Sequence, residues 1–282
     1  MNEAGKIIRD LRREAGYTQK TLAEALHVTV QAISKWERGI CFPDVALLPK
    51  LSLLIDADMD LLVARSLKQE EWVGLIDIPD CDFSQTVFDK PLVYFLLSHF
   101  MLLGIRDIHV RTNERNRAYL LGDRFKALGF RFSFEIPEDR NMMVLSHPWF
   151  LFGSNLTRQF QGAMVSEKSA KLAPENQEPV FLFCRRNDSR RYFEEKDRFV
   201  KGMPVRKLGR GMVCFDMGDY DKALDVASFV RTYQKNAGLL IGSLEEIAFR
   251  KGIITADQLL KMADSVPYRE YLQCLADKPL VV

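Results

Sequence analysis

The sequence predicts a multidomain protein in which an all-α unit of short helices precedes an α/β unit that ends in further helices. Two observations predict this order. Over residues 1–64 apolar residues recur every three or four positions between helix caps and glycines, whereas beyond residue 70 short apolar runs alternate with helical segments. A chain of 282 residues is also long enough for two domains. We therefore expect an all-α domain at 1–64, a polar linker at 65–70 and an α/β domain at 71–282.

The composition excludes several classes of protein. Hydrophobic residues make up 47% and charged residues 28% of the chain, which excludes a wholly disordered or collagen-like protein. The net charge of +2 gives no sign of a nucleic-acid or membrane partner. The apolar stretch 92–105 is too short to cross a bilayer. Because the N-terminus is charged and the five cysteines form no disulfide or zinc motif, we expect a cytoplasmic protein.

Helix boundaries can be placed from local chemistry in the first unit. The first helix should end at Gly16, and its apolar face is formed by Ala4, Ile8, Leu11 and Ala15. Thr18 is placed to cap a second helix with the inner residues Leu22, Ala23 and Leu26. His27 then lies in a tight turn that needs a left-handed backbone. Thr29 is placed to cap a third helix with Ile33 and Trp36 inside, and further helices are expected at 44–55 and 59–64.

Two short helices joined by a tight turn make a helix-turn-helix. The segment 17–55 resembles phage-repressor-like, or XRE, helix-turn-helix proteins through Thr18-Gln19, Leu22-Ala23, Val28, Ile33-Ser34, Trp36-Glu37, Gly39 and Pro43. The resemblance implies a double-stranded DNA operator as partner, with the helix after Thr29 in the major groove. It also implies an internal ion pair between Arg12 and Glu37. The alternative is a helical protein-interaction domain that does not bind DNA.

The chemistry of the side chains suggests a role for each DNA contact. Gln31 is the candidate base reader, because its planar amide can pair with both polar groups of an adenine edge, and Val30 can contact a thymine methyl. Thr18 and Gln19 stand at a helix N-terminus, where phosphates bind. The complete set of expected DNA contacts is Thr18, Gln19, Lys20, Thr29, Val30, Gln31, Ser34, Lys35 and Arg38. A head of this kind reads one half-site, so we expect at least a dimer.

The remaining residues alternate between strands and helices. We expect strands at 72–78, 107–111, 131–136 and 142–146, with helices at 92–103 and 114–128 between them. This order predicts a parallel, doubly wound, Rossmann-like sheet. Three C-terminal helices are expected, with inner residues Leu224, Ala227, Val230 and Tyr233, then Ile247 and Ala248, then Leu259, Leu260 and Met262. His99 and His109 are expected in the core, and the basic stretch 185–210 as a solvated hairpin or, alternatively, a phosphate- or DNA-binding segment.

Two blocks of this region resemble the beginning and end of sugar-1-phosphate nucleotidyltransferases, in particular glucose-1-phosphate thymidylyltransferases. The blocks are 87–112 and 210–260, with the matching pieces Asp89-Lys90-Pro91, Gly104 to Ile108, Arg210-Gly211, Asp216-Met217-Gly218, Gln234, Gly238-Leu239 and Glu245 to Ala248. The resemblance implies a nucleotidyltransferase-type fold. It also implies that Asp216 is one of two carboxylates that hold magnesium.

The departures from this family concern its chemistry. Its glycine-rich phosphate loop follows the first strand, but here Gly74 is the only glycine between Trp72 and Asp89, and no Lys or Arg lies between Trp72 and Lys90. His147 stands where the other metal-binding aspartate belongs, and imidazole is a poor magnesium ligand. We therefore predict no catalytic residue, Asp216 as a remnant, and Mg²⁺ only if activity is retained. The alternative is an active sugar-1-phosphate nucleotidyltransferase with a DNA-binding head.

The resemblance also implies a second, regulatory nucleotide pocket, which maps here onto Phe152, Gly153, Arg210, Glu246, Ile247 and Arg250. Arginine suits a diphosphate because its planar fork pairs with two oxygens. The hypothesis is a transcriptional regulator whose pseudo-nucleotidyltransferase domain forms a homodimer or higher oligomer, binds a dTDP- or UDP-sugar effector and has no membrane partner. The alternative is that these residues only pack a helix and support dimerisation.

Overall fold

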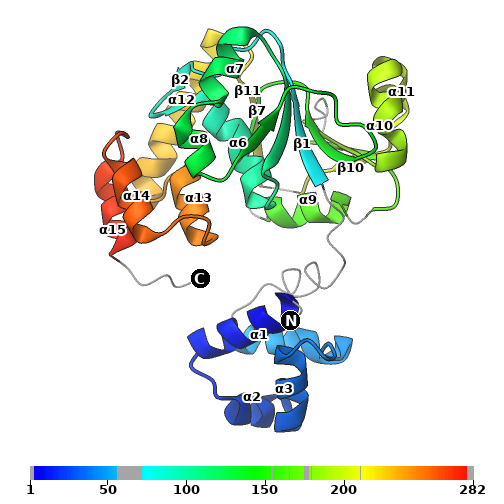
Figure 1. The fold of residues 1–282 in the computed structure, drawn as a ribbon, viewed down its shortest axis with the longest axis vertical. Coiled ribbons are helices and arrows are strands. Elements are labelled where there is room, and N and C mark those ends of the chain that lie inside the picture. Colours follow the sequence, from blue (N-terminus) through cyan, green and yellow to red (C-terminus); the bar gives the residue numbers. More distant parts are fainter. Residues whose placement is uncertain are drawn as a thin grey trace. The chain divides into compact units, whose positions relative to one another are not determined.

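The computed structural model describes residues 3–55, 72–153, 155–164, 166–174, 178, 180–209 and 211–277. The chain divides into two compact units, one with the helices α1 to α4 and one with the elements from β1 to α15 (Figure 1). The predicted helix at 59–64 and the linker at 65–70 lie outside the described residues. Within the described residues, no helix is long and apolar enough to cross a membrane.

The first unit is helical throughout. It contains α1 (Glu3–Glu14), α2 (Gln19–Leu26), α3 (Val30–Glu37), the 3₁₀ turn η1 (Val45–Leu47) and α4 (Leu48–Leu54). Its core contains the predicted inner residues Ile8, Leu11, Leu22, Ala23, Leu26, Ile33 and Trp36, together with Leu51 and Ile55. Ala15 was wrongly assigned to this core: it is exposed because α1 ends one residue earlier. The predicted helix 44–55 starts as a 3₁₀ turn, in which Asp44 accepts a hydrogen bond from the Ala46 N–H.

The predicted caps and turn of the helical unit are confirmed. Thr18 Oγ1 accepts a hydrogen bond from the N–H of Thr21, and the Thr18 N–H donates one to Thr21 Oγ1. His27 has a left-handed backbone with φ of 58°, as the tight turn requires. Thr29 accepts a hydrogen bond from the N–H of Ala32. The caps at Thr18 and Thr29 fix where α2 and α3 begin, and the turn at His27 fixes where α2 ends.

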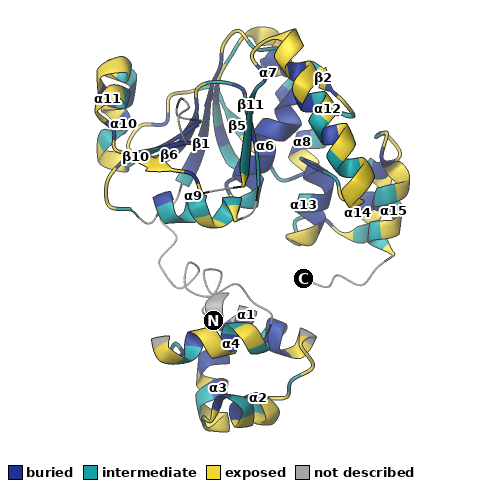
Figure 2. Ribbon diagram, turned by 180° about the vertical axis from the view of Figure 1, so that it is seen from behind, coloured by how far each residue is buried: buried dark blue, intermediate teal, exposed yellow. Residues whose placement is uncertain are grey.

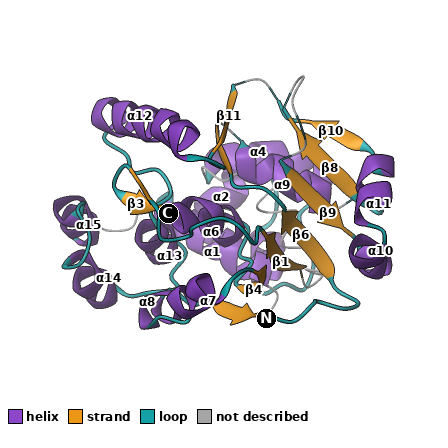
Figure 3. Ribbon diagram, turned by 90° about the horizontal axis from the view of Figure 1, so that it is seen from above, coloured by secondary structure: helices purple, strands orange, loops and turns teal. Residues whose placement is uncertain are grey.

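Among the described residues of the second unit, seven strands form the main sheet in the order β10-β8-β9-β6-β1-β4-β5, which Figure 3 shows from above. The strands are β1 (Trp72–Asp77), β4 (Asp107–Arg111), β5 (Arg131–Ser133), β6 (Asn141–Leu145), β8 (Ala170–Ala173), β9 (Phe181–Cys184) and β10 (Val205–Lys207). Strands β1, β4, β5 and β6 are parallel, as predicted. The sheet as a whole is mixed, because β9, which was not predicted, runs antiparallel to β6 and β8. The connection from β8 to β9 is too short for the crossover that parallel pairing needs.

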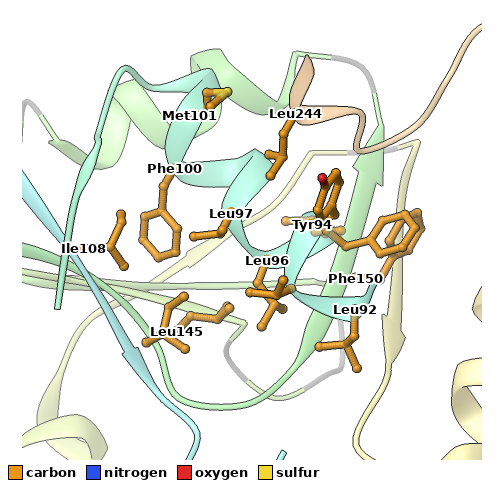
Figure 4. Packing of buried hydrophobic residues seen from close by; sticks show 14 of the residues in the cluster. Leu92, Tyr94, Leu96, Leu97, Phe100, Met101, Ile108, Leu145, Phe150 and Leu244 are labelled. Carbon is orange, nitrogen blue, oxygen red and sulfur yellow. The ribbon is translucent and has the colours of Figure 1, made fainter. Parts of the chain in front are cut away.

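Helices cover both faces of this sheet. The predicted helix at 92–103 is α6 (Leu92–Leu102), in which every residue from Leu92 to Met101 is buried (Figures 2 and 4). It packs on the face that carries Ile76, Ile108 and Leu145. The alternate strand residues Val73 and Leu75 face the other side, under α10 (Ser189–Glu194) and α11 (Lys196–Gly202).

The outer elements complete the unit. They are β2 (Thr86–Val87), β3 (Lys90–Pro91), α7 (Glu114–Leu120), α8 (Asp123–Ala127), β7 (Trp149–Gly153), α9 (Leu156–Met164), η2 (Arg186–Asp188), β11 (Met212–Asp216), α12 (Tyr220–Ala237), α13 (Leu244–Arg250), α14 (Ala256–Ala263) and α15 (Arg269–Ala276). The predicted helix 114–128 is two helices, because Gly122 interrupts it with an extended backbone. The predicted strand 131–136 ends at Ser133.

Other sequence-based assignments also need correction. The stretch 185–210 is not a hairpin, since its described part forms η2, α10, α11 and β10. Leu224 and Leu260 are exposed, and α12 turns Ala223 and Val226 inward together with the predicted Val230. His99 is buried as predicted, whereas His109 is half-buried and donates a hydrogen bond to the carbonyl of Glu135.

The burial of α6 generates a stability prediction. Leu97→Ala removes a fully buried side chain and should lower the free energy of unfolding by about 2–5 kcal/mol, because it leaves a cavity. Leu121→Ala, at a position that is 49% exposed, is the matched control and should change it by less than about 1 kcal/mol. Urea denaturation followed by circular dichroism measures both. Equal losses in the two variants would contradict the assigned core.

Candidate functional site

The outer face of α3 carries polar and apolar side chains that are open to a partner. Val30 is 40% exposed, and Gln31 and Lys35 are also exposed, whereas Ile33 and Trp36 face the core. Gln31 makes no hydrogen bond through its side chain to any residue in the described part of the chain. The helix therefore presents its N-terminal half outward.

The other expected DNA contacts differ in their exposure and in the hydrogen bonds that they make within the protein. Lys20 and Arg38 are exposed, and Ser34 is half-buried. Arg38 donates a hydrogen bond to the Ser34 carbonyl at 3.2 Å. Thr18 and Thr29 are exposed and use their hydroxyl oxygens as helix caps.

A buried ion pair and its hydrogen-bonded neighbour join the three helices α1, α2 and α3. Arg12 Nε donates to Glu37 Oε1 at 2.5 Å, and both side chains are more than nine-tenths buried. The predicted pair is thus confirmed. Gln19 Nε2 donates to Glu37 Oε2 at 2.7 Å, so α1, α2 and α3 all contribute to one network. This structural role of Gln19 was missed from the sequence, where nothing marks a contact with a residue on α3.

In the second unit, the two residues expected at the metal position contact each other. His147 precedes β7, Asp216 ends β11, and the two strands are antiparallel. His147 Nε2 lies 2.5 Å from Asp216 Oδ1, which also accepts a hydrogen bond from the N–H of Gly218. Lys222 Nζ donates to Asp216 Oδ2 at 2.7 Å and lies 3.1 Å from Asp219 Oδ2.

These contacts set the charge at Asp216. Its partial burial alone would raise its pKa, but hydrogen bonds from Lys222, Gly218 and His147 outweigh this effect, and the pKa of Asp216 is lowered. The hydrogen bonds to Asp216 and Asp219 raise the pKa of Lys222. An ammonium thus holds one oxygen of this carboxylate and an imidazole the other. This donor set does not fit a magnesium ion, which prefers several oxygen ligands.

A second buried carboxylate lies at the end of β1, where the resemblance would place the start of a phosphate loop. Asp77 is 5% exposed and accepts hydrogen bonds from Lys196 Nζ at 2.7 Å and Tyr192 Oη at 3.0 Å. Arg111 Nη1 lies 3.2 Å from its other oxygen. A carboxylate here repels a phosphate, and its cations are already engaged. The sequence signal was an acidic residue inside an otherwise apolar, buried strand.

The predicted effector residues fall in two places. Glu246, on α13, is buried and accepts hydrogen bonds from Arg250 Nε at 2.8 Å and Tyr271 Oη at 3.0 Å, while Ile247 is half-buried. Phe152 and Gly153 lie on β7, and the Phe152 ring is 4.7 Å from that of Tyr233. Arg210 lies outside the described residues. Within those, no hydrogen bond or ring contact joins Phe152 to the Glu246–Arg250 pair.

The neighbouring residues that carry the resemblance form a buried polar network. Glu245 is fully buried and accepts hydrogen bonds from Tyr94 Oη, Arg124 Nη2 and Tyr268 Oη. Lys90 is likewise fully buried, and it donates to Asp89 and Gln234. Burial lowers the pKa of Lys90 despite these partners. Several of the matching residues therefore have a structural role.

Comparison with known proteins assigns the first unit. Residues 8–62 match the helix-turn-helix family HTH_3. A stretch of 61 residues is 39% identical to the HTH-type transcriptional regulator ImmR of Bacillus subtilis and covers 22% of this chain and 48% of that protein. The first unit therefore contains a helix-turn-helix domain of the XRE type.

The second unit is similar to sugar nucleotidyltransferases. Over 79 residues the chain is 40% identical to glucose-1-phosphate thymidylyltransferase of Mycolicibacterium smegmatis, but it spans only 27% of that relative. Over 257 residues it is 25% identical to the Neisseria meningitidis enzyme of that name, covering 67% of this chain and 88% of the relative. A crystal structure titled as a putative glucose-1-phosphate thymidylyltransferase from Bacillus anthracis overlaps 57% of this chain and 96% of its own, with a TM-score of 0.44 and 11% identity.

The Arg12–Glu37 pair generates a second stability prediction. Arg12→Met leaves a buried carboxylate without its cation and should destabilise the helical unit by about 3–5 kcal/mol. Lys20→Met, at an exposed position of α2, is the control and should have little effect. Thermal unfolding of the full chain, followed by circular dichroism, compares them. Similar unfolding temperatures for the two variants would show that the network does not hold the helices together.

Proposed function

We propose that this protein is a sequence-specific DNA-binding transcriptional regulator, with the DNA-binding domain at 1–64 and a linker at 65–70. One observation carries the proposal: the capped and ion-paired α2–α3 hairpin presents the N-terminal half of α3 outward. This is the part of a recognition helix that meets base edges in the major groove. The match of residues 8–62 to a helix-turn-helix family, and the likeness to a transcriptional regulator, support the same function.

The exposed residues then divide by role. Gln31 reads an adenine, and Val30 packs against a thymine methyl on the same groove floor. Phosphate contacts come from the N-terminus of α2 (Thr18, Gln19 and Lys20) and from Arg38. Ser34 and Lys35, one turn after Gln31, are further candidates for base contacts, and Thr29 also lies at the DNA. Since the Gln19 side-chain N–H is engaged with Glu37, Gln19 contacts DNA through its backbone N–H at the helix N-terminus.

We further propose that the α/β domain at 71–282 is a nucleotidyltransferase-like pseudoenzyme that dimerises and binds a nucleotide or a dTDP- or UDP-sugar. The His147–Asp216–Lys222 contacts and the buried Asp77 support the loss of the reaction, since phosphoryl transfer depends on positioning and charge neutralisation of the phosphates. A bound effector changes operator affinity only if it binds two conformations unequally. In this proposal Arg250, together with Arg210, meets the diphosphate.

Substitution of Gln31 tests the DNA-binding proposal. Gln31→Ala should cost about 1–3 kcal/mol at one base pair and relax specificity there, because one bidentate contact is lost. Leu53→Ala, at an exposed position of α4, is the control and should bind as the wild type does. Fluorescence anisotropy with the operator and its single-base variants measures both. If Gln31→Ala binds every site as the wild type does, the recognition helix is wrongly assigned.

A transferase assay tests the loss of activity. With glucose 1-phosphate, dTTP or UTP and Mg²⁺, the protein should form no pyrophosphate, since Lys222 and His147 hold the carboxylate that would bind the metal. Turnover that Asp216→Ala abolishes would establish the enzyme instead.

Thermal-shift titration tests the effector. dTDP-rhamnose, dTDP-glucose or UDP-glucose should raise the unfolding temperature of the wild type. The same ligand should raise that of Arg250→Ala much less, each protein being compared with its own ligand-free state because Arg250 also pairs with Glu246. Arg269→Ala, which changes an exposed arginine on α15, is the control. The absence of any shift would favour a domain that only dimerises.

A further inference from the structure

The ribbon of β7 and β11 has one covered and one open edge. The register pairs Cys214 with Leu151, whose carbonyl accepts a hydrogen bond from His99 Nε2 at 3.0 Å on the side away from β11. The N–H and C=O of one strand residue lie on the same side, so Leu151 and Cys214 form a non-hydrogen-bonded pair. The bond from the Met217 N–H to the Pro148 carbonyl fits this alternation. The N–H and C=O of Met212 and Cys214 therefore point away from β7.

This outer edge is apolar. Met212, Val213, Cys214 and Phe215 are half-buried and uncharged, and in the described part of the chain no backbone group outside β7 pairs with β11. Exposed strand edges invite pairing with another strand, and proteins usually protect them with charges, proline or very short strands. Among the described residues this four-residue apolar stretch has no partner on its outer edge, and it is therefore suited to pairing with another strand.

The same chain protects its other sheet edges in the usual way. At one end of the main sheet, β10 follows Pro204 and carries Arg206 and Lys207. At the other end, β5 has only three residues and begins with Arg131. From Met212 to Phe215 the edge of β11 carries neither charge nor proline, and only Asp216 at its end is charged.

We infer that β11 pairs antiparallel with β11 of a second copy across a two-fold axis, giving a four-stranded sheet in the order β7-β11-β11-β7. A second copy is the occupant because the proposed function, on which this inference rests, requires two helix-turn-helix heads for two half-sites. A strand that pairs antiparallel with itself makes a self-complementary, closed interface. With the axis at Val213 or at Cys214, the Cys214 N–H is bonded across it.

Proline at Cys214 tests this pairing. Cys214→Pro removes the N–H on the outer edge and no N–H that bonds to β7, and proline is tolerated at such edge positions. Two hydrogen bonds are lost per dimer, so the dimer dissociation constant should rise roughly 100-fold. Cys214→Ala, which keeps the N–H, and Val205→Pro, on the protected edge of β10, should remain within about threefold of the wild type. Light scattering of the full chain over a concentration series measures all four proteins.

Hydrogen exchange of the wild type provides a measurement that does not depend on a variant. The amides of Met212 and Cys214 should be protected where the dimer forms and should exchange rapidly after dilution. A dimer that Cys214→Pro leaves unchanged, with no concentration-dependent protection of these amides, would overturn the β11 interface and leave the proposed function standing. A wild-type chain that stays monomeric at all concentrations would overturn both the interface and the proposed dimerisation.

Discussion

A carboxylate that is removed from water must be paired with a cation, and this constraint organises both units. In the helical unit the buried Glu37 is neutralised by Arg12 and bonded by Gln19, which ties α3 to α1 and α2. Breaking such a pair is costly because it leaves an uncompensated charge in the core. The orientation of α3, and so the direction in which Gln31 points, depends on this network.

The same constraint is visible at two carboxylates of the second unit. Asp77 and Asp216 lie where a phosphate loop and a metal site would be expected from the resemblance, and each is paired with cations of the chain itself: Lys196 and Arg111 at the former, Lys222 at the latter. Each of these carboxylates is therefore neutralised by side chains of the protein itself. Glu245, with Arg124, shows the same pairing in a purely structural position.

The features that were predictable from the sequence are those that depend on neighbours along the chain. Caps at Thr18 and Thr29 and the turn at His27 involve residues within four positions, and all three are confirmed. The direction of β9 depends on which distant strands it joins, which no local pattern records. Contacts such as Lys196 with Asp77 join residues far apart in the sequence, so they were missed. On α12, apolar residues occupy more than one face. For this reason the apolar spacing wrongly predicted Leu224, and not Val226, as an inner residue.

The central claim is that α3, held outward by the Arg12–Glu37–Gln19 network, reads operator DNA as one of a pair. Selection of binding sites from a random duplex library with the full chain tests this most directly. We expect enrichment of a palindrome whose half-sites are centred about 10 base pairs, or a multiple of this, apart. Recovery of no enriched sequence, or of a single unpaired half-site, would contradict it.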